Sequence, residues 1–316
     1  MPIINTAWKT DNYKFVGKAF ETNYANRMNK LAAVLGIRNT TSIDFEIAGT
    51  GGYGELSRYD GTNLNIGEMK RAFKTIITPQ EFSLSIPIGY KQAKVDKMGE
   101  CRKVGKRLGD AAAMTVYMHV LRCFGRAFDP NFVGGDGKAW AAEDHPVASK
   151  GSQGRLYIPD PDAGTYSNVI KKAFSVSAIT EAQTRANRMV TPDGLPFLCE
   201  LDTVLISPEL EEKAKKMFGA EAKLTPTQDP ESDLNAANPV YGMRYIVVGG
   251  GEDGFHGDQW AVCDRNLMKE LFNLVYITQP TTMQSELDNP LIDMHTAYAD
   301  FGIGWGDARQ IFFGRG

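Results

Sequence analysis

The chain has 316 residues, more than one hydrophobic core usually holds, so two lobes or one elaborated domain are expected. Charged residues make up 23% of it and the formal net charge is −3, which excludes a broad electrostatic attraction to nucleic acid or to an acidic membrane. The four cysteines are scattered without a Cys-x-x-Cys pair, so they indicate neither a zinc ribbon nor a small disulfide scaffold and are expected to be reduced.

The start of the chain has no basic stretch followed by an apolar one, and nowhere does the sequence approach the ~18 consecutive apolar residues of a membrane span. We therefore expect a protein that is made and kept in the cytosol, with no membrane partner. Residues 1–30 are rich in Asn, Lys and Thr with spaced aromatic side chains. Two interpretations of this segment stay open: an arm laid across a neighbouring subunit, or a first helix packed on its own domain.

Residues 42–88 have the pattern of a long hairpin arm. Ile43, Phe45 and Ile47 alternate with polar residues, and the same period of two returns in residues 82–88, so both runs predict strands that pack on one core. The stretch between the runs is glycine-rich and charged, and a loop of that length is unusual inside a compact domain. It is either disordered alone or ordered by contact with another chain, and the second alternative makes self-assembly the leading hypothesis.

Residues 91–124 contain no proline and repeat apolar side chains with the period of a helix, so one long helix is expected. At 1.5 Å per residue it would be roughly 50 Å long. Its first half carries a stripe of Lys and Arg, which is most often a solvated face. A contact with an acidic assembly partner is the alternative.

Residues 129–166 are rich in Gly, Pro, Asp and Ser and predict a loop-rich connector. A second lobe of mixed α and β structure follows, with a helix over 179–189 and another that is opened by Ser207 as N-cap and Pro208 at its first position. That second helix is expected to end at Phe218. The strands expected in this lobe cover residues 203–206, 245–248, 259–263 and 274–277.

Near the C-terminal end, Phe301, Ile303 and Trp305 alternate with glycines in a final predicted strand, and glycine there indicates close approach of another part of the chain. If this strand pairs beside the strands of the first lobe, both ends of the chain build one region. Residues 168–279 would then form an inserted lobe.

The best signal of an enzyme is the Gly-x-Gly-x-x-Gly of residues 249–254, which follows an apolar strand as a dinucleotide fingerprint should. A pyrophosphate site also needs a helix N-terminus directly after the glycines, and residues 255–260 are turn-like instead. None of the four histidines has a His-x-x-x-His partner or a cysteine at ligand spacing. Asp144 and His145 lack a nucleophile elbow, so we expect no catalytic residue, no cofactor and no metal site.

Several short motifs follow one another in the middle third of the chain: Asp144-His145-Pro146, Ser167-Asn168, Ala178-Ile179, Asp193-Gly194-Leu195-Pro196 and Leu205-Ile206-Ser207-Pro208-Glu209-Leu210. Weaker signals lie in the glycine-rich residues 51–55 and 301–307. In order and approximate spacing these motifs resemble the major capsid proteins of tailed double-stranded-DNA phages. The nearest similarity is to the Mu-like major head subunit family.

This resemblance implies an α+β fold of the tailed-phage major capsid type. Its parts here would be an N-terminal arm (1–42), an extended-loop hairpin with its flanking strands (43–88), a peripheral domain with a spine helix at about 91–124 (89–167), an inserted axial domain (168–279) and a return to the peripheral domain (280–316). The extended loop itself would cover about 48–75.

The resemblance also implies a structural function without turnover. Subunits form hexamers and pentamers that tile an icosahedral shell around double-stranded DNA, without sequence-specific binding. The implied partners are the chain itself, a scaffolding protein, a portal and a decoration protein, and the implied location is the virion, after assembly in the host bacterial cytoplasm.

The candidates for contacts between subunits lie in or beside the extended loop: Tyr53, Glu55, Arg58, Asp60, Lys70, Arg71 and Lys74. The alternative for each charged residue is a solvated side chain on a flexible loop. Some members of the family crosslink neighbouring subunits through lysine and asparagine, and Lys70 or Lys74 lies in a suitable loop.

Two further hypotheses compete with the phage capsid. An encapsulin-like nanocompartment shell resembles the same fold but encloses a cargo enzyme in place of a genome. A nucleotide-dependent oxidoreductase centred on residues 249–254 would have to bind a dinucleotide as an isolated monomer.

Overall fold

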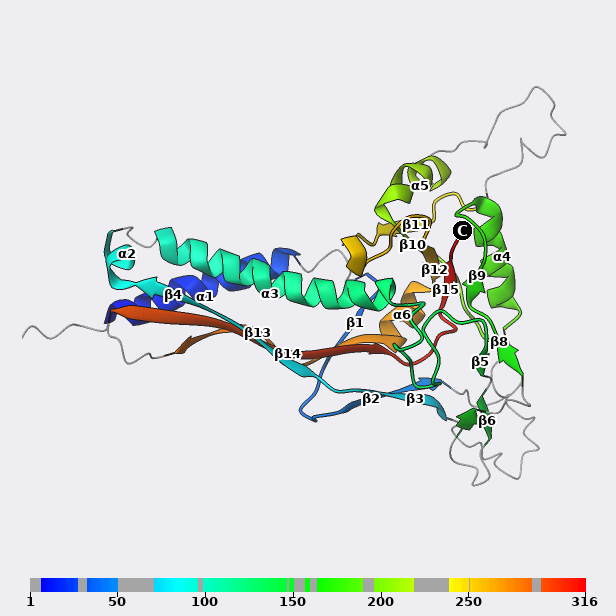
Figure 1. Cartoon of the computed structure of the whole chain (residues 1–316), viewed down its shortest axis with the longest axis horizontal. Coiled ribbons are helices and arrows are strands. Elements are labelled where there is room, and N and C mark those ends of the chain that lie inside the picture. The colour runs from blue at the N-terminus through cyan, green and yellow to red at the C-terminus, as the bar shows by residue number, and fades with distance from the viewer. Residues whose placement is uncertain are drawn as a thin grey trace, which may run out of the picture. The chain divides into compact units, whose positions relative to one another are not determined.

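The computed structural model describes residues 7–27, 33–50, 71–95, 99–146, 148–150, 157–159, 164–189, 196–218, 239–249, 251–285 and 291–316 (Figure 1). These residues divide into two compact units. Unit 1 is built from described residues within Met1–Phe45, Ile77–Val120 and Asn273–Ile303. Unit 2 is built from those within Glu46–Ile76, Leu121–Phe272 and Gly304–Gly316.

Unit 1 is organised around a four-stranded sheet in the order β1-β13-β14-β4. These strands are Gly36–Asn39 (β1), Phe272–Ser285 (β13), Ile292–Trp305 (β14) and Gln80–Gly89 (β4). β1 lies parallel to β13, and β14 pairs antiparallel with β4. The glycine-spaced C-terminal strand therefore does pair beside a strand of the first lobe. The predicted close approach is confirmed at Gly302, where a Cβ atom would lie 2.6 Å from Cγ2 of Ile77.

Helix α1 (Ala7–Arg27) packs on unit 1 through its apolar face. Its Val16 and Phe20 form one buried cluster with Leu108, with Ile88 of β4 and with Ala297 of β14. Leu108 belongs to helix α3 (Gly99–Gly125), so both helices contribute to the same core. Residues 7–27 therefore form a helix that packs on its own unit, and a contact of this segment with a neighbouring subunit stays a prediction.

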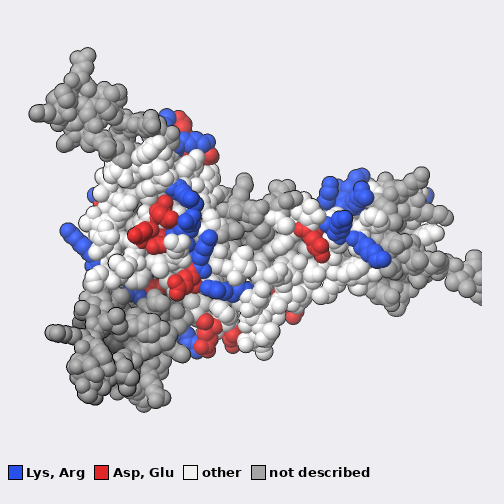
Figure 2. Space-filling model, turned by 180° about the vertical axis from the view of Figure 1, so that it is seen from behind, with Lys and Arg blue, Asp and Glu red and all other residues white. Residues whose placement is uncertain are grey.

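The span predicted as one long helix contains two: α2 (Tyr90–Val95) and α3, with residues 96–98 outside the described part of the chain. The basic side chains described in the first half of α3 are exposed: Arg102, Lys103, Lys106 and Arg107. Exposure in a single chain fits a solvated face and a contact with a partner equally, so both alternatives stay predictions. On the face shown in Figure 2, acidic and basic side chains mix in the left part, and mainly basic side chains gather at the right.

Unit 2 is organised around a five-stranded sheet in the order β11-β10-β12-β15-β9. These strands are Arg244–Val247 (β11), Thr203–Ile206 (β10), Trp260–Cys263 (β12), Ile311–Gly314 (β15) and Val169–Ile170 (β9). β12 pairs antiparallel with both β10 and β15, whereas β11 lies parallel to β10 and β9 lies parallel to β15. The strands predicted at 203–206, 245–248 and 259–263 are confirmed to within one residue.

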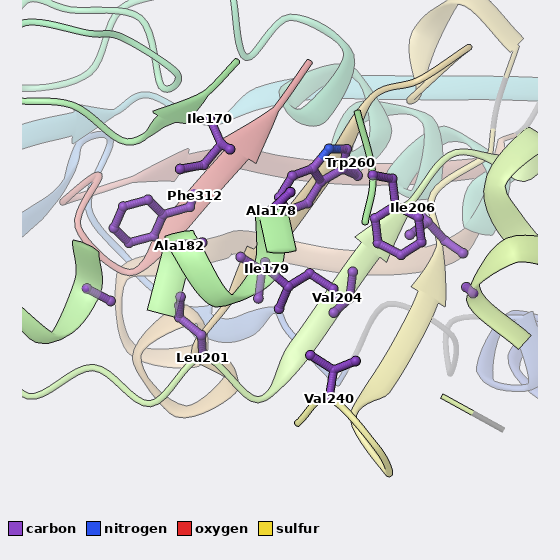
Figure 3. Close-up of a cluster of buried hydrophobic side chains, with 14 of the residues drawn as sticks. Ile170, Ala178, Ile179, Ala182, Leu201, Val204, Ile206, Val240, Trp260 and Phe312 are labelled. Carbon is purple, nitrogen blue, oxygen red and sulfur yellow. The ribbon is translucent and has the colours of Figure 1, made fainter. Parts of the chain in front are cut away.

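Every residue of β10, β12 and β15 is buried, as in a sheet that is covered on both faces. Figure 3 shows the core on one side of this sheet, where Val204, Trp260 and Phe312 meet Ile179. Ile179 belongs to α4 (Val176–Asn187), and α5 (Glu211–Phe218) adds residues to the same cluster.

The segment after β10 begins with a 3₁₀ turn, Pro208–Leu210, and continues as α5 to Phe218. The predicted start of this segment is confirmed, with Ser207 at the N-cap and Pro208 directly after it; the Ser207 hydroxyl donates to the carbonyl of Gly257 at 2.6 Å and makes no capping bond. Two other caps were not predicted. The Ser175 hydroxyl accepts from the N–H of Ala178 in α4, and the Asp264 carboxylate accepts from two N–H groups of α6 (Arg265–Leu271).

The strands of the predicted hairpin arm form a sheet of their own, in which β2 (Phe45–Thr50) pairs with β3 (Arg71–Ile77). The partner of the first alternating run is therefore β3, and the second run, 82–88, belongs to β4 and pairs with β14. The prediction that both runs pack fully on one core is wrong at Ile43, which is 78% exposed because it precedes β2 in a bend. Shorter strand pairs join β5 (His145–Pro146) to β8 (Thr165–Tyr166) and β6 (Ala148–Lys150) to β7 (Tyr157–Pro159).

The two compact units divide the chain differently from the predicted domains. Unit 2 begins at Leu121, well before residue 168, and it also includes the last described residues, Gly304–Gly316. The physical reason is β15, which fills the gap between β12 and β9 in the five-stranded sheet.

Substitution of Gly105 tests the close packing of α1 on α3. A Cβ atom at Gly105 would lie 2.5 Å from the backbone oxygen of Val16, so Gly105→Ala is expected to lower the free energy of unfolding by about 1–3 kcal/mol. Gly17→Ala is the matched control, because the nearest atom there is Oγ1 of Thr282 at 3.5 Å and the helix gains up to ~1 kcal/mol of intrinsic propensity. Urea denaturation measures both, and equal effects of the two substitutions would contradict this packing.

Candidate assembly site and its polar network

Most of the residues predicted to contact neighbouring subunits fall outside the described residues: Tyr53, Glu55, Arg58, Asp60 and Lys70. Arg71 is the first residue of β3, and nothing is described of its side chain. Lys74 is described, and its ammonium forms an ion pair with the carboxylate of Glu46 on β2. Both side chains are about half exposed, 48% and 55%, so the pair contributes at most about 1 kcal/mol. Sequence reasoning missed Glu46 because the register of β2 on β3 was not known.

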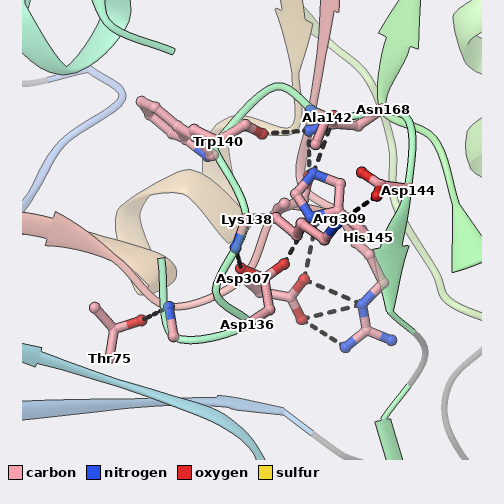
Figure 4. Close-up of polar contacts among 12 residues, drawn as sticks. Thr75, Asp136, Lys138, Trp140, Ala142, Asp144, His145, Asn168, Asp307 and Arg309 are labelled. Carbon is pink, nitrogen blue, oxygen red and sulfur yellow. Dashed lines mark hydrogen bonds and ion pairs between the residues drawn. The ribbon is translucent and has the colours of Figure 1, made fainter. Parts of the chain in front are cut away.

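The base of the β2–β3 hairpin is attached to a turn of the loop-rich connector (Figure 4). The N–H of Gly135 donates to Oγ1 of Thr75 in β3 at 2.9 Å. A Cβ atom at Gly135 would lie 2.4 Å from the carbonyl oxygen of Lys74, so only glycine fits against this strand. The next residue, Asp136, contacts the buried ring of His145.

His145 links that turn to the interior of unit 2. Its Nδ1 lies 2.6 Å from Oδ2 of Asp136, and its Nε2 lies 3.2 Å from Oδ1 of Asn168. The ring is buried and stacks on Tyr166 with 5.1 Å between the ring centroids. Burial and then the charge of Asp307 raise the pKa of Tyr166 well above its usual value, so its hydroxyl stays protonated.

Asn168 is fully buried and all its side-chain polar atoms are used. Its Nδ2 donates to the carbonyl of Trp140 at 2.7 Å and, at 3.3 Å each, to those of Ala308 and Ile311. Its Oδ1 accepts from the N–H of Ala142 at 3.0 Å. These partners fix the orientation of the amide, so Oδ1 is an acceptor toward His145 and Nε2 of His145 is the donor.

Both ring nitrogens of His145 therefore lie against oxygen atoms, Oδ2 of Asp136 on one side and Oδ1 of Asn168 on the other. The ring bridges the connector turn and the buried amide.

A second buried pair lies beside the network. Nε and Nη2 of Arg309 donate to the Asp307 carboxylate at 2.5–3.2 Å, and the guanidinium also lies 4.6 Å from the ring centroid of Phe197. Burial alone would raise the pKa of Asp307, but the charge and hydrogen bonds of Arg309 outweigh it and hold that pKa below its usual range. Sequence reasoning missed this pair as well as Asp136 and Trp140, since no spacing connects them to His145.

The signals of metal, thiol and dinucleotide chemistry can each be followed in the described residues. Among them, no group of three His, Cys, Asp or Glu side chains could hold a metal ion. The thiols of Cys123 and Cys199 are buried, which raises the pKa of each to about 12 and keeps them unreactive. After β11, the chain enters a single 3₁₀ turn, Gly251–Asp253, and the next described α-helix is α6, so the dinucleotide fingerprint has no helix N-terminus to bind a pyrophosphate.

In the part of the chain that the structure describes, no helix has the length and apolar character needed to cross a membrane. The polar network has a structural effect: its hydrogen bonds join the base of the β2–β3 hairpin to the connector, and the connector to β15.

Known structures share this architecture. The virus-like particle protein from Pyrococcus furiosus matches with a TM-score of 0.50 and 8% sequence identity over 96% of this chain and 99% of that one. The procapsid protein of bacteriophage JBD30 matches with a TM-score of 0.51 and 13% identity over 99% and 75% of the two chains. The mature capsid protein of bacteriophage PhiM1 matches with a TM-score of 0.51 and 15% identity over 90% and 86%.

No protein-family model and no curated protein sequence matches the chain. The likeness is thus one of fold, and the predicted fold class is confirmed: the chain has the α+β fold of tailed-phage major capsid proteins.

Replacement of Asn168 tests the network. Asn168→Ala leaves the Ala142 N–H and three carbonyls without their buried partner, so we expect the free energy of unfolding to fall by about 2–4 kcal/mol. Asn131→Ala is the control, since that amide bonds only to Asp129 in an exposed turn and its loss is expected to cost less than ~0.5 kcal/mol. Denaturant unfolding measures the free energy of unfolding of both variants. Equal losses in the two would show that the network does not stabilise unit 2.

The Asp307–Arg309 pair predicts a dependence on acid. A carboxylate whose folded pKa is depressed stabilises the protein above its unfolded pKa, and this contribution is lost as the pH falls through the folded pKa. Below pH ~4 the free energy of unfolding of the wild type is therefore expected to fall as the pH falls. In Asp307→Asn this fall is expected to be smaller, by up to ~1.4 kcal/mol per pH unit. Asp258→Asn, an exposed carboxylate of the same unit, is the control. Identical slopes for wild type and Asp307→Asn would overturn the assignment.

Proposed function

We propose that this chain is a major capsid protein that assembles into the shell of a tailed-phage head. The observation that carries this proposal is the likeness over 99% of the chain to the JBD30 procapsid protein, joined by the likeness to the PhiM1 capsid protein. On this proposal the protein is structural and carries out no reaction. It is a component of the virion, assembled in the host bacterial cytoplasm.

The parts of the chain take the roles that this fold supplies. We assign residues 1–42 to an N-terminal arm, 43–88 to the extended-loop hairpin, 89–167 and 280–316 to a peripheral domain, and 168–279 to an axial domain. α3, with 27 residues, is the spine helix of the peripheral domain. The connected pair β2 and β3 supports the extended loop, which would contact a neighbouring subunit through Tyr53, Glu55, Arg58, Asp60, Lys70 and Arg71.

The finer family assignment rests on the sequence. The order of Asp144-His145-Pro146 and Ser167-Asn168 supports membership of the Mu-like major head subunit family, and the structure gives both motifs a shared role because β5 pairs with β8 beside them. Hexamers and pentamers would enclose double-stranded DNA without reading its sequence. A scaffolding protein, a portal and a decoration protein are the expected partners.

Exposed apolar side chains support assembly through many small contacts. Leu198 is 86% exposed, and Ile43 and Ile76 near the hairpin strands are also exposed. Scattered apolar residues of this kind leave a free subunit soluble, while repeated interfaces around each subunit multiply modest affinities into a stable shell.

A nanocompartment of the encapsulin type is the second candidate, because its shell protein resembles the same fold. The content of purified particles distinguishes the two. Double-stranded DNA inside supports the phage head, and a copurifying cargo enzyme supports the compartment.

Replacement of residues 52–70 by a Gly-Ser segment of equal length tests the proposal. It removes the side chains of the extended loop and keeps the connection between β2 and β3, so we expect a folded, soluble subunit that forms no closed shells. Negative-stain electron microscopy and sedimentation velocity compare it with the wild type, with thermal unfolding as the check on folding. Normal shells from the variant would show that the loop is not an assembly element.

If the wild type itself stays monomeric under every assembly condition, including coexpression with a small acidic protein encoded beside it, the capsid proposal fails. Charge variants within the loop then need no further test.

A further inference from the structure

A pocket of about 340 Å³ in unit 2 has three arginines among its lining residues, Arg185, Arg188 and Arg309. Arg185 belongs to the last turn of α4, Arg188 is its C-cap residue, and Arg309 lies just before β15. Met189 and Tyr166 line the same pocket. Positive charge from segments more than a hundred residues apart in sequence therefore converges on one hollow, which we call the arginine pocket.

The neighbouring carboxylates leave this charge unbalanced. Arg309 and Asp307 form a neutral buried pair. Glu181, however, is shared by two cations, with its oxygens 2.6 Å from Nη2 of Arg185 and 2.7 Å from Nζ of Lys172. One carboxylate thus serves two positive groups.

Arg188 adds a further charge that no described carboxylate pairs with. Its place at the C-terminal end of α4 complements the helix dipole, but that dipole amounts to only about −0.5 charge. Among the described residues of these ion pairs, Arg185, Arg188, Arg309 and Lys172, set against Glu181, Asp307 and the dipole, leave an excess of roughly 1.5 positive charges, to which Lys172 contributes from beside the pocket. A solvated helix end would explain Arg188 alone, but it does not explain the convergence of three guanidinium groups.

We propose that the arginine pocket binds the carboxylate of an Asp or Glu side chain from a second copy of this chain. The inference rests on the proposed function, since it needs copies packed against one another. A single carboxylate matches the excess charge, and guanidinium groups bind carboxylates through paired N–H donors. The chain supplies the occupant, with 38 acidic residues against 35 Lys and Arg.

The other lining residues suit a protein side chain better than an isolated ion. Met189 and Tyr166 offer apolar surface for the methylene groups of a glutamate. The Tyr166 hydroxyl, which stays protonated, adds a neutral donor. Inorganic phosphate shares the oxyanion chemistry and is the competing ligand that the experiment separates.

The first experiment asks whether the pocket binds a carboxylate in the unassembled full-length subunit. Glutarate and inorganic phosphate are titrated separately at constant ionic strength, and the signal of the Met189 methyl group is followed by NMR, with Met268, buried in α6, as an internal reference. We expect glutarate to shift the Met189 signal selectively, with affinity about tenfold or more weaker in Arg188→Gln and partly retained in Arg188→Lys. Arg244→Gln, which removes an exposed arginine of β11, is expected to bind like the wild type.

The second experiment asks whether a second copy is the occupant. Glutarate is expected to slow shell formation by the wild type, and Arg188→Gln is expected to form shells at least tenfold more slowly than Arg244→Gln.

The site is overturned if glutarate does not shift the Met189 signal, or if Arg188→Gln binds glutarate as tightly as the wild type does. Tighter binding of phosphate than of glutarate overturns the carboxylate assignment. Shells that form equally fast from Arg188→Gln overturn the second copy as occupant. If the wild type forms no shells at all, the proposed function fails and the binding result still decides the site.

Discussion

The side-chain amide of Asn168 holds together segments that are far apart in the sequence. It donates to carbonyls of Trp140, Ala308 and Ile311 and accepts from Ala142, in a site without solvent access. Each of these backbone groups would cost about 1–3 kcal/mol if it were buried without a partner. A single side chain that satisfies all of them makes the loop-rich connector and the strand β15 depend on one another, because displacing either leaves polar groups of the other unpaired.

The same constraint extends outward to the predicted assembly element. His145 connects the Asn168 amide to Asp136, and the neighbouring Gly135 bonds to Thr75 in the hairpin strand β3. The hairpin base is thus fastened to a buried network, while the ion pair of Lys74 and Glu46 adds only a surface contact. On the proposed function this matters, since a contact element that moves at its base loses more entropy on docking than one that starts from a fixed base.

The regular parts of this fold were predictable because their signals are local. Continuous apolar runs located β10, β11 and β12, and the period of a helix located α3. The partner of β2 was not predicted, since most of β3 was placed in the extended loop, and only the fold shows that these two strands pair. The polar network was not predicted either, because Asp136, Asn168 and Asp307 belong to no shared sequence motif and only the fold brings them together. Candidate residues in the extended loop followed from resemblance and stay predictions.

The position of β15 fixes when unit 2 can complete its sheet during synthesis. This strand lies between β12 and β9, and the bond from Asn168 to the carbonyl of Ile311 joins residues 143 positions apart. Until the ribosome has made residues 311–314, β12 and β9 have no common neighbour, and the ring of Trp260 has no Gly314 backbone to lie against. Chains released early therefore lack an interior strand, and a sheet with that gap exposes two unpaired edges. The sheet of unit 2 is therefore complete only in a chain that has been made as far as β15.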